Sequence, residues 1–215
     1  MSCALLIVDM QNDFVSRGGY YDRRQNGETA TALEAPSEPQ PFTVRTPALG
    51  KVVDRVAREI GRARREGWPI AFLLATYGHE FSRRPRFLLG PENAGRRHHA
   101  CKPGTWGSRL VDPIAALLPR PGGKDETVLH KNTLDGFLGT DLQEFLSSRS
   151  VKTVAVVGVE THACVLSTAM SAGLHQFDTV ILEDCTWTAK PDLGQMALQL
   201  FAEAFGRTTT SDLFR

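Results

Sequence analysis

The sequence lacks any apolar run long enough to cross a membrane, and it has little excess charge of either sign. Its 215 residues include 25 basic and 24 acidic side chains, which gives a formal net charge of +1. A nearly neutral chain has no electrostatic reason to bind nucleic acid or an anionic membrane surface, so we expect neither as a partner. The first apolar run, Ala4 to Val8, has no basic region before it, so we also expect no signal peptide.

Cysteine is scarce as well. The chain has four cysteines, at Cys3, Cys101, Cys164 and Cys185. They show neither the close pairing of a disulfide framework nor the spacing of a metal-binding finger. Reduced cysteines suit the cytoplasm, where we expect the protein to reside. Cys3 and Cys185 fit structural roles, whereas Cys101, in a loop beside residues 104–107, fits either a structural role or a site role.

Strand and helix patterns alternate along the chain, which predicts a parallel sheet with helices on both faces. Short apolar runs predict strands at 4–9, 69–75, 127–131, 152–158, 178–183 and 206–210. Helical spacing predicts helices at 47–66, 109–118, 140–149, 163–174 and 190–204. No repeat or linker divides the chain, so we expect one domain over residues 1–215. Its predicted fold is a three-layer, Rossmann-like α/β fold with six strands.

One segment interrupts this alternation. Residues 16–46 are rich in glycine and proline and poor in apolar side chains, which predicts a long loop. Loops of this length in compact domains are often lids or binding elements. Because the segment leaves the sheet soon after Asp9, we expect a lid or an oligomer contact, with a variable surface insertion as the alternative.

Cys164 is the strongest functional signal in the chain. It follows an apolar strand, residues 154–157, and a turn at Gly158, and it opens a segment with helical spacing. Backbone N–H groups and the positive end of a helix dipole favour a thiolate at this place, and a thiolate is a nucleophile. The alternative is a small buried cysteine that packs under the sheet.

Two charged residues end other predicted strands. Asp9 follows the first apolar run, and Lys131 ends the short run at 127–131. Ligands of open parallel sheets bind at the carboxyl ends of the strands, so we expect Asp9, Lys131 and Cys164 to converge on one crevice. There the carboxylate can take the thiol proton and return it to a leaving nitrogen, while the ammonium stabilises the negative charges.

In its motifs the chain resembles the isochorismatase-like cysteine hydrolases. The matching segments occur in the expected order over nearly the whole chain: 6–14 (LIVDMQNDF), 104–107 (GTWG), 130–132 (HKN), 139–142 (GTDL), 158–165 (GVETHACV) and 180–184 (VILED). The resemblance implies that Asp9, Lys131 and Cys164 form a catalytic triad. It also implies a cis peptide bond between Val159 and Glu160, in the turn whose backbone N–H groups, with that of Cys164, hold an oxyanion.

Other residues are candidate contacts for a substrate. This set comprises Phe14, His79, Trp106, Asn132 and Phe137. The resemblance places an aromatic residue in the pocket at Phe137, and His79 is expected on the pocket wall. For the other three we retain an alternative: Trp106 anchors its loop, Asn132 forms a turn, and Phe14 fixes a loop exit. His162, close to Cys164 in sequence, is the alternative general base. The resemblance assigns that role to Asp9, which leaves His162 a structural role or a role in supporting the site residues.

A departure from the pattern of the metal-binding members of this family argues against a metal site and against a nicotinamidase. Metal-binding nicotinamidases of this family carry an aspartate two residues before a histidine, but Tyr77 stands two residues before His79 here. His98 and His99 lie near the position at which those enzymes carry a second metal-binding histidine, but the spacing of the three histidines is not specific for zinc. The first strand is not followed by a GxGxxG motif, so no nucleotide cofactor is implied. We therefore expect neither a metal nor a cofactor.

Together these features predict a cysteine-dependent hydrolase of a non-peptide C–N bond, acting through a Cys164 thioester. The substrate is expected to be a small amide, a carbamoyl or ureido compound, or a lactam; residues 18–20 (GGY) resemble ureido-amidohydrolases and favour a ureido or amide group. One alternative is isochorismatase-type vinyl ether hydrolysis, whose enzymes lack the cysteine. Another is a catalytically silent binding module on the same fold. The resemblance also implies a homodimer or homotetramer.

Overall fold

The computed structural model describes residues 2–28, 40–77, 100–119 and 124–214. At its centre lies a parallel sheet of six strands in the order β3-β2-β1-β4-β5-β6. The strands are β1 (Cys3–Val8), β2 (Ile70–Ala75), β3 (Glu126–Lys131), β4 (Thr153–Val159), β5 (Asp178–Trp187) and β6 (Arg207–Thr209). The predicted α/β fold with a six-stranded parallel sheet is confirmed.

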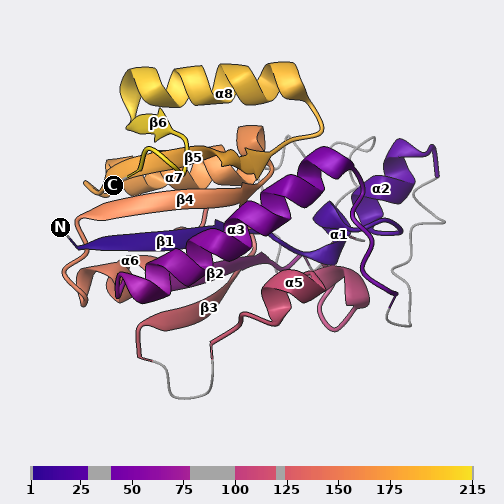
Figure 1. Ribbon diagram of the computed structural model, residues 1–215, viewed down its shortest axis with the longest axis horizontal. Coiled ribbons are helices and arrows are strands. Elements are labelled where there is room, and N and C mark those ends of the chain that lie inside the picture. Colours follow the sequence, from indigo (N-terminus) through magenta and orange to yellow (C-terminus); the bar gives the residue numbers. More distant parts are fainter. Residues whose placement is uncertain (1, 29–39, 78–99, 120–123, 215) are drawn as a thin grey trace.

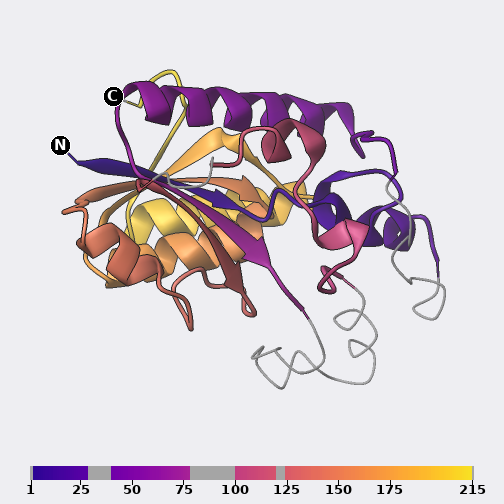
Figure 2. The same ribbon diagram turned by 90° about the horizontal axis from the view of Figure 1, so that it is seen from below.

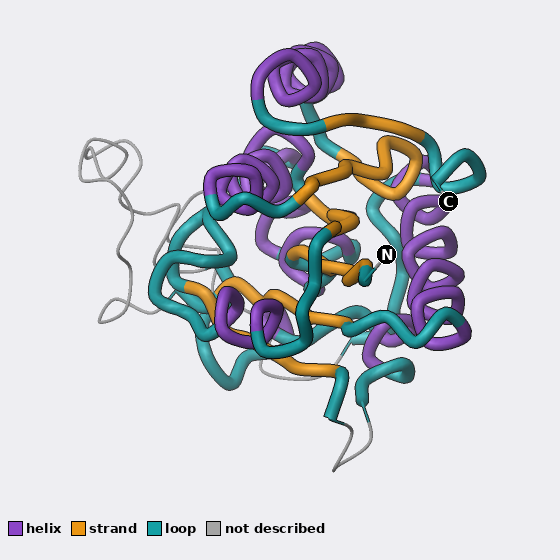
Figure 3. The backbone as a smooth tube through the Cα atoms, turned by 90° about the vertical axis from the view of Figure 1, so that its left-hand side faces the viewer, coloured by secondary structure: helices purple, strands orange, loops and turns teal. Residues whose placement is uncertain are grey.

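Helices cover both faces of the sheet (Figure 1 and Figure 2). On one face lie α3 (Pro47–Arg65) and α5 (Asp112–Ala115), and on the other lie α6 (Leu142–Ser147), α7 (Leu166–Leu174) and α8 (Pro191–Ala204). Figure 3, seen from the side of the N-terminus, shows the strands twisting between these helical layers. The predicted three-layer arrangement is therefore present.

The central strand β1 explains why the strand sequences read as continuous apolar runs. Successive side chains of a strand point to opposite faces of the sheet. Leu5 and Ile7 pack in the core layer that includes α3, whereas Leu6 and Val8 pack in the layer that includes α6 and α7. All six residues of β1 are buried, as expected for a parallel sheet covered on both faces.

The direction of strand order reverses between β1 and β4, which are neighbours in the sheet and distant in sequence. In sheets of this type, ligands bind outside the carboxyl ends of the strands at this reversal. Gly158 lets the two strands approach closely: its φ is 118°, and a Cβ there would lie 2.1 Å from the carbonyl oxygen of Val8. Only glycine suits this conformation and this contact.

The sequence predicted the ends of α3 correctly. Thr46 caps the helix, since its Oγ1 accepts a hydrogen bond from the N–H of Leu49 at 3.2 Å, and Pro47 is the first helical residue. Gly67, just after the helix, has a φ of 67°. At 19 residues α3 is long, but no helix in the described ranges is both long and apolar enough to cross a membrane.

The predicted helix at 109–118 is wrong for most of its length, because only Asp112–Ala115 forms α5. Leu110 instead makes an isolated antiparallel bridge with Gln11, and the N–H of Val111 donates to the carbonyl oxygen of Met10 at 3.0 Å. These bonds to the segment after β1 hold residues 110–111 extended. The helix can begin only after them.

The predicted loop at 16–46 also needs correction. Within it Tyr20–Gln25 forms helix α2, and Ser16 makes an antiparallel bridge with Val44. The start of α2 is held by Asp13, whose Oδ1 accepts a hydrogen bond from the N–H of Tyr20 at 2.9 Å. This contact with α1 (Asn12–Val15) folds the beginning of the segment onto the carboxyl end of the sheet (Figure 1). Residues 29–39 lie outside the described ranges.

Candidate active site

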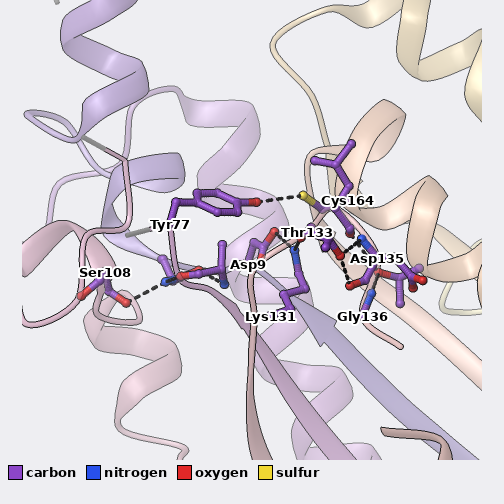
Figure 4. Close-up of polar contacts among 12 residues, drawn as sticks. Asp9, Tyr77, Ser108, Lys131, Thr133, Asp135, Gly136 and Cys164 are labelled. Carbon is purple, nitrogen blue, oxygen red and sulfur yellow. Dashed lines mark hydrogen bonds and ion pairs between the residues drawn. The ribbon is translucent and has the colours of Figure 1, made fainter. Parts of the chain in front are cut away.

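The side chains at the ends of β1 and β3 form a buried ion pair. Asp9 directly follows β1, and Lys131 is the last residue of β3. Lys131 Nζ donates to Asp9 Oδ2 at 2.9 Å, and 0% of either side chain is exposed. The same ammonium donates to the carbonyl oxygen of Thr133 at 3.1 Å (Figure 4). The expected meeting of the aspartate and the lysine at the sheet edge is confirmed.

The surroundings keep Lys131 protonated. Burial alone would lower the pKa of its ammonium, but the interactions with Asp9 and Cys164 outweigh burial and raise the pKa of Lys131 above its usual value. Asp9 Oδ1 is buried and has no hydrogen-bond partner among the described residues. One oxygen of the carboxylate is therefore held by the lysine, and the other is available to accept a proton.

The backbone at Asp9 makes a tight turn that holds the carboxylate in place. Its φ of 53° lies in the left-handed region, which is uncommon for a residue with a side chain. The N–H of Asp9 donates to the carbonyl oxygen of Leu73 at 2.9 Å, and the carbonyl oxygen of Asp9 accepts from the N–H of Gln11 at 2.7 Å. These two bonds tie the turn to the neighbouring strand β2 and to the next residues of the chain.

Cys164 lies between β4 and α7, in the π-helical turn η4 (Thr161–Val165). The helix predicted at 163–174 is therefore a regular α-helix only from Leu166. The peptide bond between Val159 and Glu160 is cis, as predicted. Only 4% of Cys164 is exposed, so its sulfur lies in an enclosed environment at the start of a helix.

A residue to which the sequence assigned no role reaches the sulfur. Tyr77 follows β2 by two residues and is fully buried, and its hydroxyl lies 3.9 Å from Cys164 Sγ (Figure 4). The sequence showed only that Tyr77 stands where related metal-binding enzymes carry an aspartate. Its place just past a strand of the same sheet edge was the signal that could have identified it.

Gln11 joins the loops that follow β1 and β2. Its Nε2 donates to the carbonyl oxygens of Ala75 and Ser108, at 2.9 and 2.7 Å. Its Oε1 accepts from the N–H of Ala75 at 2.8 Å. Figure 4 shows Ser108 at the end of this link. Gln11 therefore positions the end of β2, and with it the approach to Tyr77.

Asp13 is a second buried link between loops. Its two carboxylate oxygens accept hydrogen bonds from the N–H groups of Tyr20, at 2.9 Å, and Cys101, at 2.6 Å. Burial raises the pKa of Asp13, and these backbone hydrogen bonds oppose the shift. At Gly107 a Cβ would lie 2.2 Å from Asp13 Oδ1, so the loop at 104–107 packs closely over the carboxylate. Asp13 therefore has a structural role, since it ties the start of α2 and the backbone at Cys101 to α1.

The two aromatic candidates nearest these links have structural contacts. Trp106, in the 3₁₀ helix η3 (Trp106–Ser108), is buried, and its carbonyl oxygen accepts from Asn12 Nδ2 at 3.1 Å. Phe14 is buried in α1, and its ring stacks on Tyr21 with centroids 5.1 Å apart. Both therefore anchor the loops after β1, and their contact with a substrate stays a prediction.

The remaining candidates are placed differently. Asn132 is half-buried and directly follows Lys131. Phe137 is buried, and its ring stacks on His175 with centroids 4.9 Å apart, at the end of α7 opposite Cys164. This contact gives Phe137 a packing role, and its place in a pocket stays a prediction. His79 lies outside the described residues.

His162 turns to the loop after β5. Its Nδ1 lies 2.7 Å from the hydroxyl oxygen of Thr188, which itself donates to Glu160 Oε2 at 3.1 Å. Burial lowers the pKa of His162, and the Glu160 carboxylate partly opposes this. These contacts agree with the structural role expected for His162.

Within the described ranges no group of three or more His, Cys, Asp or Glu side chains is arranged to hold a metal ion. The three histidines that the sequence raised as conceivable ligands, His79, His98 and His99, lie outside those ranges. Whether these histidines bind a metal is therefore not tested by the described residues, and the expectation of no metal stays a prediction.

Comparisons with known proteins identify the family of this chain. The ureidoacrylate amidohydrolase RutB of Cronobacter turicensis is 30% identical over 212 residues, covering 94% of this chain and 82% of the relative. Nicotinamidase PncA of Bacillus subtilis has a similar structure, with a TM-score of 0.76 at 21% identity over 98% of this chain and 100% of that one. The structure of N-carbamoylsarcosine amidase of Thermoplasma acidophilum is also similar, with a TM-score of 0.70 at 22% identity. The match covers 100% of this chain and 99% of that one. The sequence model of the isochorismatase domain matches residues 3–212, so this chain belongs to the isochorismatase family.

Proposed function

We propose that this protein is a cysteine-dependent hydrolase of a small, non-peptide C–N bond, with Cys164 as nucleophile, Asp9 as acid and base, and Lys131 as the charge that stabilises both. The observation that carries the proposal is the buried Asp9–Lys131 pair next to the Cys164 sulfur. A carboxylate, an ammonium and a thiol enclosed together at the carboxyl ends of parallel strands are the groups that acyl transfer requires.

The first half of the reaction forms a thioester. Asp9 Oδ1 takes the thiol proton as Cys164 Sγ attacks the carbonyl carbon of the substrate, which forms the C–S bond and a tetrahedral oxyanion. Backbone N–H groups of the turn from Val159 to Cys164 donate hydrogen bonds to this oxyanion. When the intermediate collapses, the C–N bond breaks and Asp9 returns its proton to the leaving nitrogen.

The second half consumes water. Asp9, again ionised, takes a proton from a water molecule whose oxygen attacks the thioester carbon. The C–S bond then breaks, the proton on Asp9 passes to the departing sulfur, and the acid is released. Lys131 stays protonated throughout and offsets whichever of Asp9 and Cys164 carries the negative charge, which is the role its raised pKa supports.

The substrate we propose is a ureido compound or a small amide. RutB of Cronobacter turicensis is a ureidoacrylate amidohydrolase, and its 30% identity to this chain supports this class. The alternatives are less well supported: vinyl ether hydrolysis makes no use of Cys164, and a silent binding module makes no use of the ion pair. We further propose a cytoplasmic location and a homodimer or homotetramer, with segment 16–46 as a lid or a contact between subunits.

The test is ammonia release from a panel of nicotinamide, N-carbamoyl amino acids, ureidoacrylate and biuret, with a cyclic lactam followed by mass change. Wild type and Cys164→Ala are compared with and without a chelator. We expect turnover of at least one ureido or amide substrate that disappears in Cys164→Ala and is insensitive to the chelator. Turnover that survives in Cys164→Ala would exclude the cysteine as nucleophile.

A further inference from the structure

Tyr77 places a phenol hydroxyl against the nucleophile. The hydroxyl lies 3.9 Å from Cys164 Sγ, and the ring is fully buried. Figure 4 shows the ring extending toward the sulfur above Asp9, while Lys131 lies below. The sulfur is therefore approached by a neutral hydroxyl from the segment after β2 as well as by the charged pair at the ends of β1 and β3.

The backbone around Tyr77 holds this hydroxyl in position. Its N–H donates to the carbonyl oxygen of Cys101 at 3.2 Å, and the N–H of Cys101 donates in turn to Asp13 Oδ2 at 2.6 Å. On the other side, the N–H of Thr76 donates to the carbonyl oxygen of Lys131 at 2.8 Å. The backbone that carries the phenol is thus connected, through Cys101, to the buried carboxylate of Asp13 and, through Thr76, to the strand that ends at Lys131.

A phenol suits this place because it donates without changing charge. Its ordinary pKa is about 10, so it keeps its proton at neutral pH while it donates to a thiolate. Hydrogen bonds of this kind are often long before substrate binds, and they shorten when the acceptor gains charge. The sulfur carries negative charge when the thiol is deprotonated and again when it leaves the thioester, but not in the thioester itself.

We propose that Tyr77 is a fourth catalytic residue, which donates a hydrogen bond from its hydroxyl to the Cys164 thiolate both before attack and as the sulfur leaves. This proposal rests on Cys164 acting as the nucleophile. Because the bond is stronger when the sulfur is charged, it raises the fraction of Cys164 present as the attacking thiolate, and it stabilises the charge that returns to the sulfur as the thioester breaks. Tyr77 keeps its proton through the cycle, so the proton steps assigned to Asp9 are unchanged.

The test is the pH dependence of Cys164 alkylation by iodoacetamide, located by peptide mapping, in Tyr77→Phe and wild type. The other titratable side chains described around the sulfur, Asp9, Lys131 and Cys101, are the same in both proteins. One charge-assisted hydrogen bond corresponds to about a tenfold effect. We therefore expect the midpoint of the alkylation profile to lie at higher pH in Tyr77→Phe, by up to about one pH unit, with alkylation slower than in wild type below the wild-type midpoint and at least as fast above both midpoints.

Tyr20→Phe is the matched control, because Tyr20 is also fully buried but belongs to α2. We expect its profile to coincide with that of wild type. A Tyr77→Phe profile that coincides with wild type, or an equal shift in Tyr20→Phe, would overturn the proposal. If Tyr77→Phe fails to fold, the same alkylation profile is measured with 3-fluorotyrosine at position 77. Its more acidic hydroxyl should move the midpoint of the profile to lower pH. An unchanged midpoint would contradict the proposal.

Alkylation requires no substrate, so this result is independent of the hydrolase assignment. If Cys164→Ala retains turnover, the proposed function fails while the alkylation profile still shows whether Tyr77 stabilises the thiolate. If turnover depends on Cys164, kcat/KM of Tyr77→Phe should fall about tenfold below the midpoint and approach wild type above it, as one lost hydrogen bond predicts.

Discussion

Lys131 donates a hydrogen bond to Asp9 across 2.9 Å, and neither of the two side chains is exposed to solvent. The two residues are 122 positions apart in the chain and two strands apart in the sheet, since β2 separates β3 from β1. Because neither charge has solvent to stabilise it, each depends on the other, and this dependence makes the pair sensitive to substitution.

Lys131→Met should therefore lower the free energy of unfolding by about 3–5 kcal/mol, because it leaves the Asp9 carboxylate buried without its partner. Urea unfolding measures the change. Combining it with Asp9→Asn should restore part of the loss. The control is Arg207→Ala, whose pair with Asp178 is about half exposed and should contribute less than about 1 kcal/mol. Equal decreases in the free energy of unfolding in Lys131→Met and Arg207→Ala would show that breaking the buried pair costs no more than breaking an exposed one.

Iodoacetamide near neutral pH should label Cys164 before the other three cysteines. Burial raises the pKa of Cys3 and of Cys185 to about 12, and burial also raises the pKa of Cys101 well above its ordinary value. A thiol reacts through its thiolate, so these three should react slowly. Peptide mapping of protein labelled to one equivalent checks this. Label spread evenly over the four sites would show that Cys164 is not activated.

His162→Asn should keep turnover within about threefold of wild type, because a histidine that served as general base would contribute 10²–10⁴-fold. The imidazole contacts Thr188 and Glu160, and an asparagine can keep one hydrogen bond to the threonine hydroxyl. The measurement is kcat/KM on whichever substrate the panel identifies. A loss of 100-fold or more in a folded variant would move the role of base from Asp9 to His162.

The same histidine should make stability depend on pH. Burial lowers the pKa of His162 below the usual 6.5, and the unfolded chain therefore binds more protons than the folded one in that range. Its contribution to stability should be fully present above pH 6.5 and lost as the pH falls from there through the lowered pKa. Urea unfolding from pH 8 to pH 5 should show a smaller acid loss in His162→Asn than in wild type. Parallel curves would contradict this prediction.

Gly158→Ala should destabilise the fold by about 3 kcal/mol or more and abolish turnover, because it forces a side chain against the Val8 carbonyl in a strained backbone conformation. Gly61→Ala is the control. It lies in α3, where the nearest atom to a new Cβ is the end of the Arg65 side chain at 3.6 Å. That exchange should raise stability by about 0.5–1 kcal/mol. Thermal unfolding distinguishes the two, and similar melting temperatures would refute the close approach of β1 and β4.

Local pattern determined much of this protein. Each predicted strand is present, since a buried parallel strand is a continuous apolar run whatever its partners are. Asp9, Lys131 and Cys164 stand at or just after strand ends, and the alternation of strands and helices brings such ends to one edge. The ordered motifs identified the family. None of these inferences requires knowledge of a contact between distant side chains.

The tertiary structure decided what depends on such contacts. Helix α2 forms where composition predicted a loop because Asp13 binds the N–H of Tyr20, and residues 110–111 stay extended because they bond to the segment after β1. The approach of Tyr77 to the sulfur likewise depends on backbone bonds to Cys101 and, through Thr76, to Lys131. Hydrogen bonds between residues far apart in sequence leave no local pattern. The sequence alone therefore predicted where Asp9, Lys131 and Cys164 lie, and only the folded chain brought a tyrosine to the proposed nucleophile.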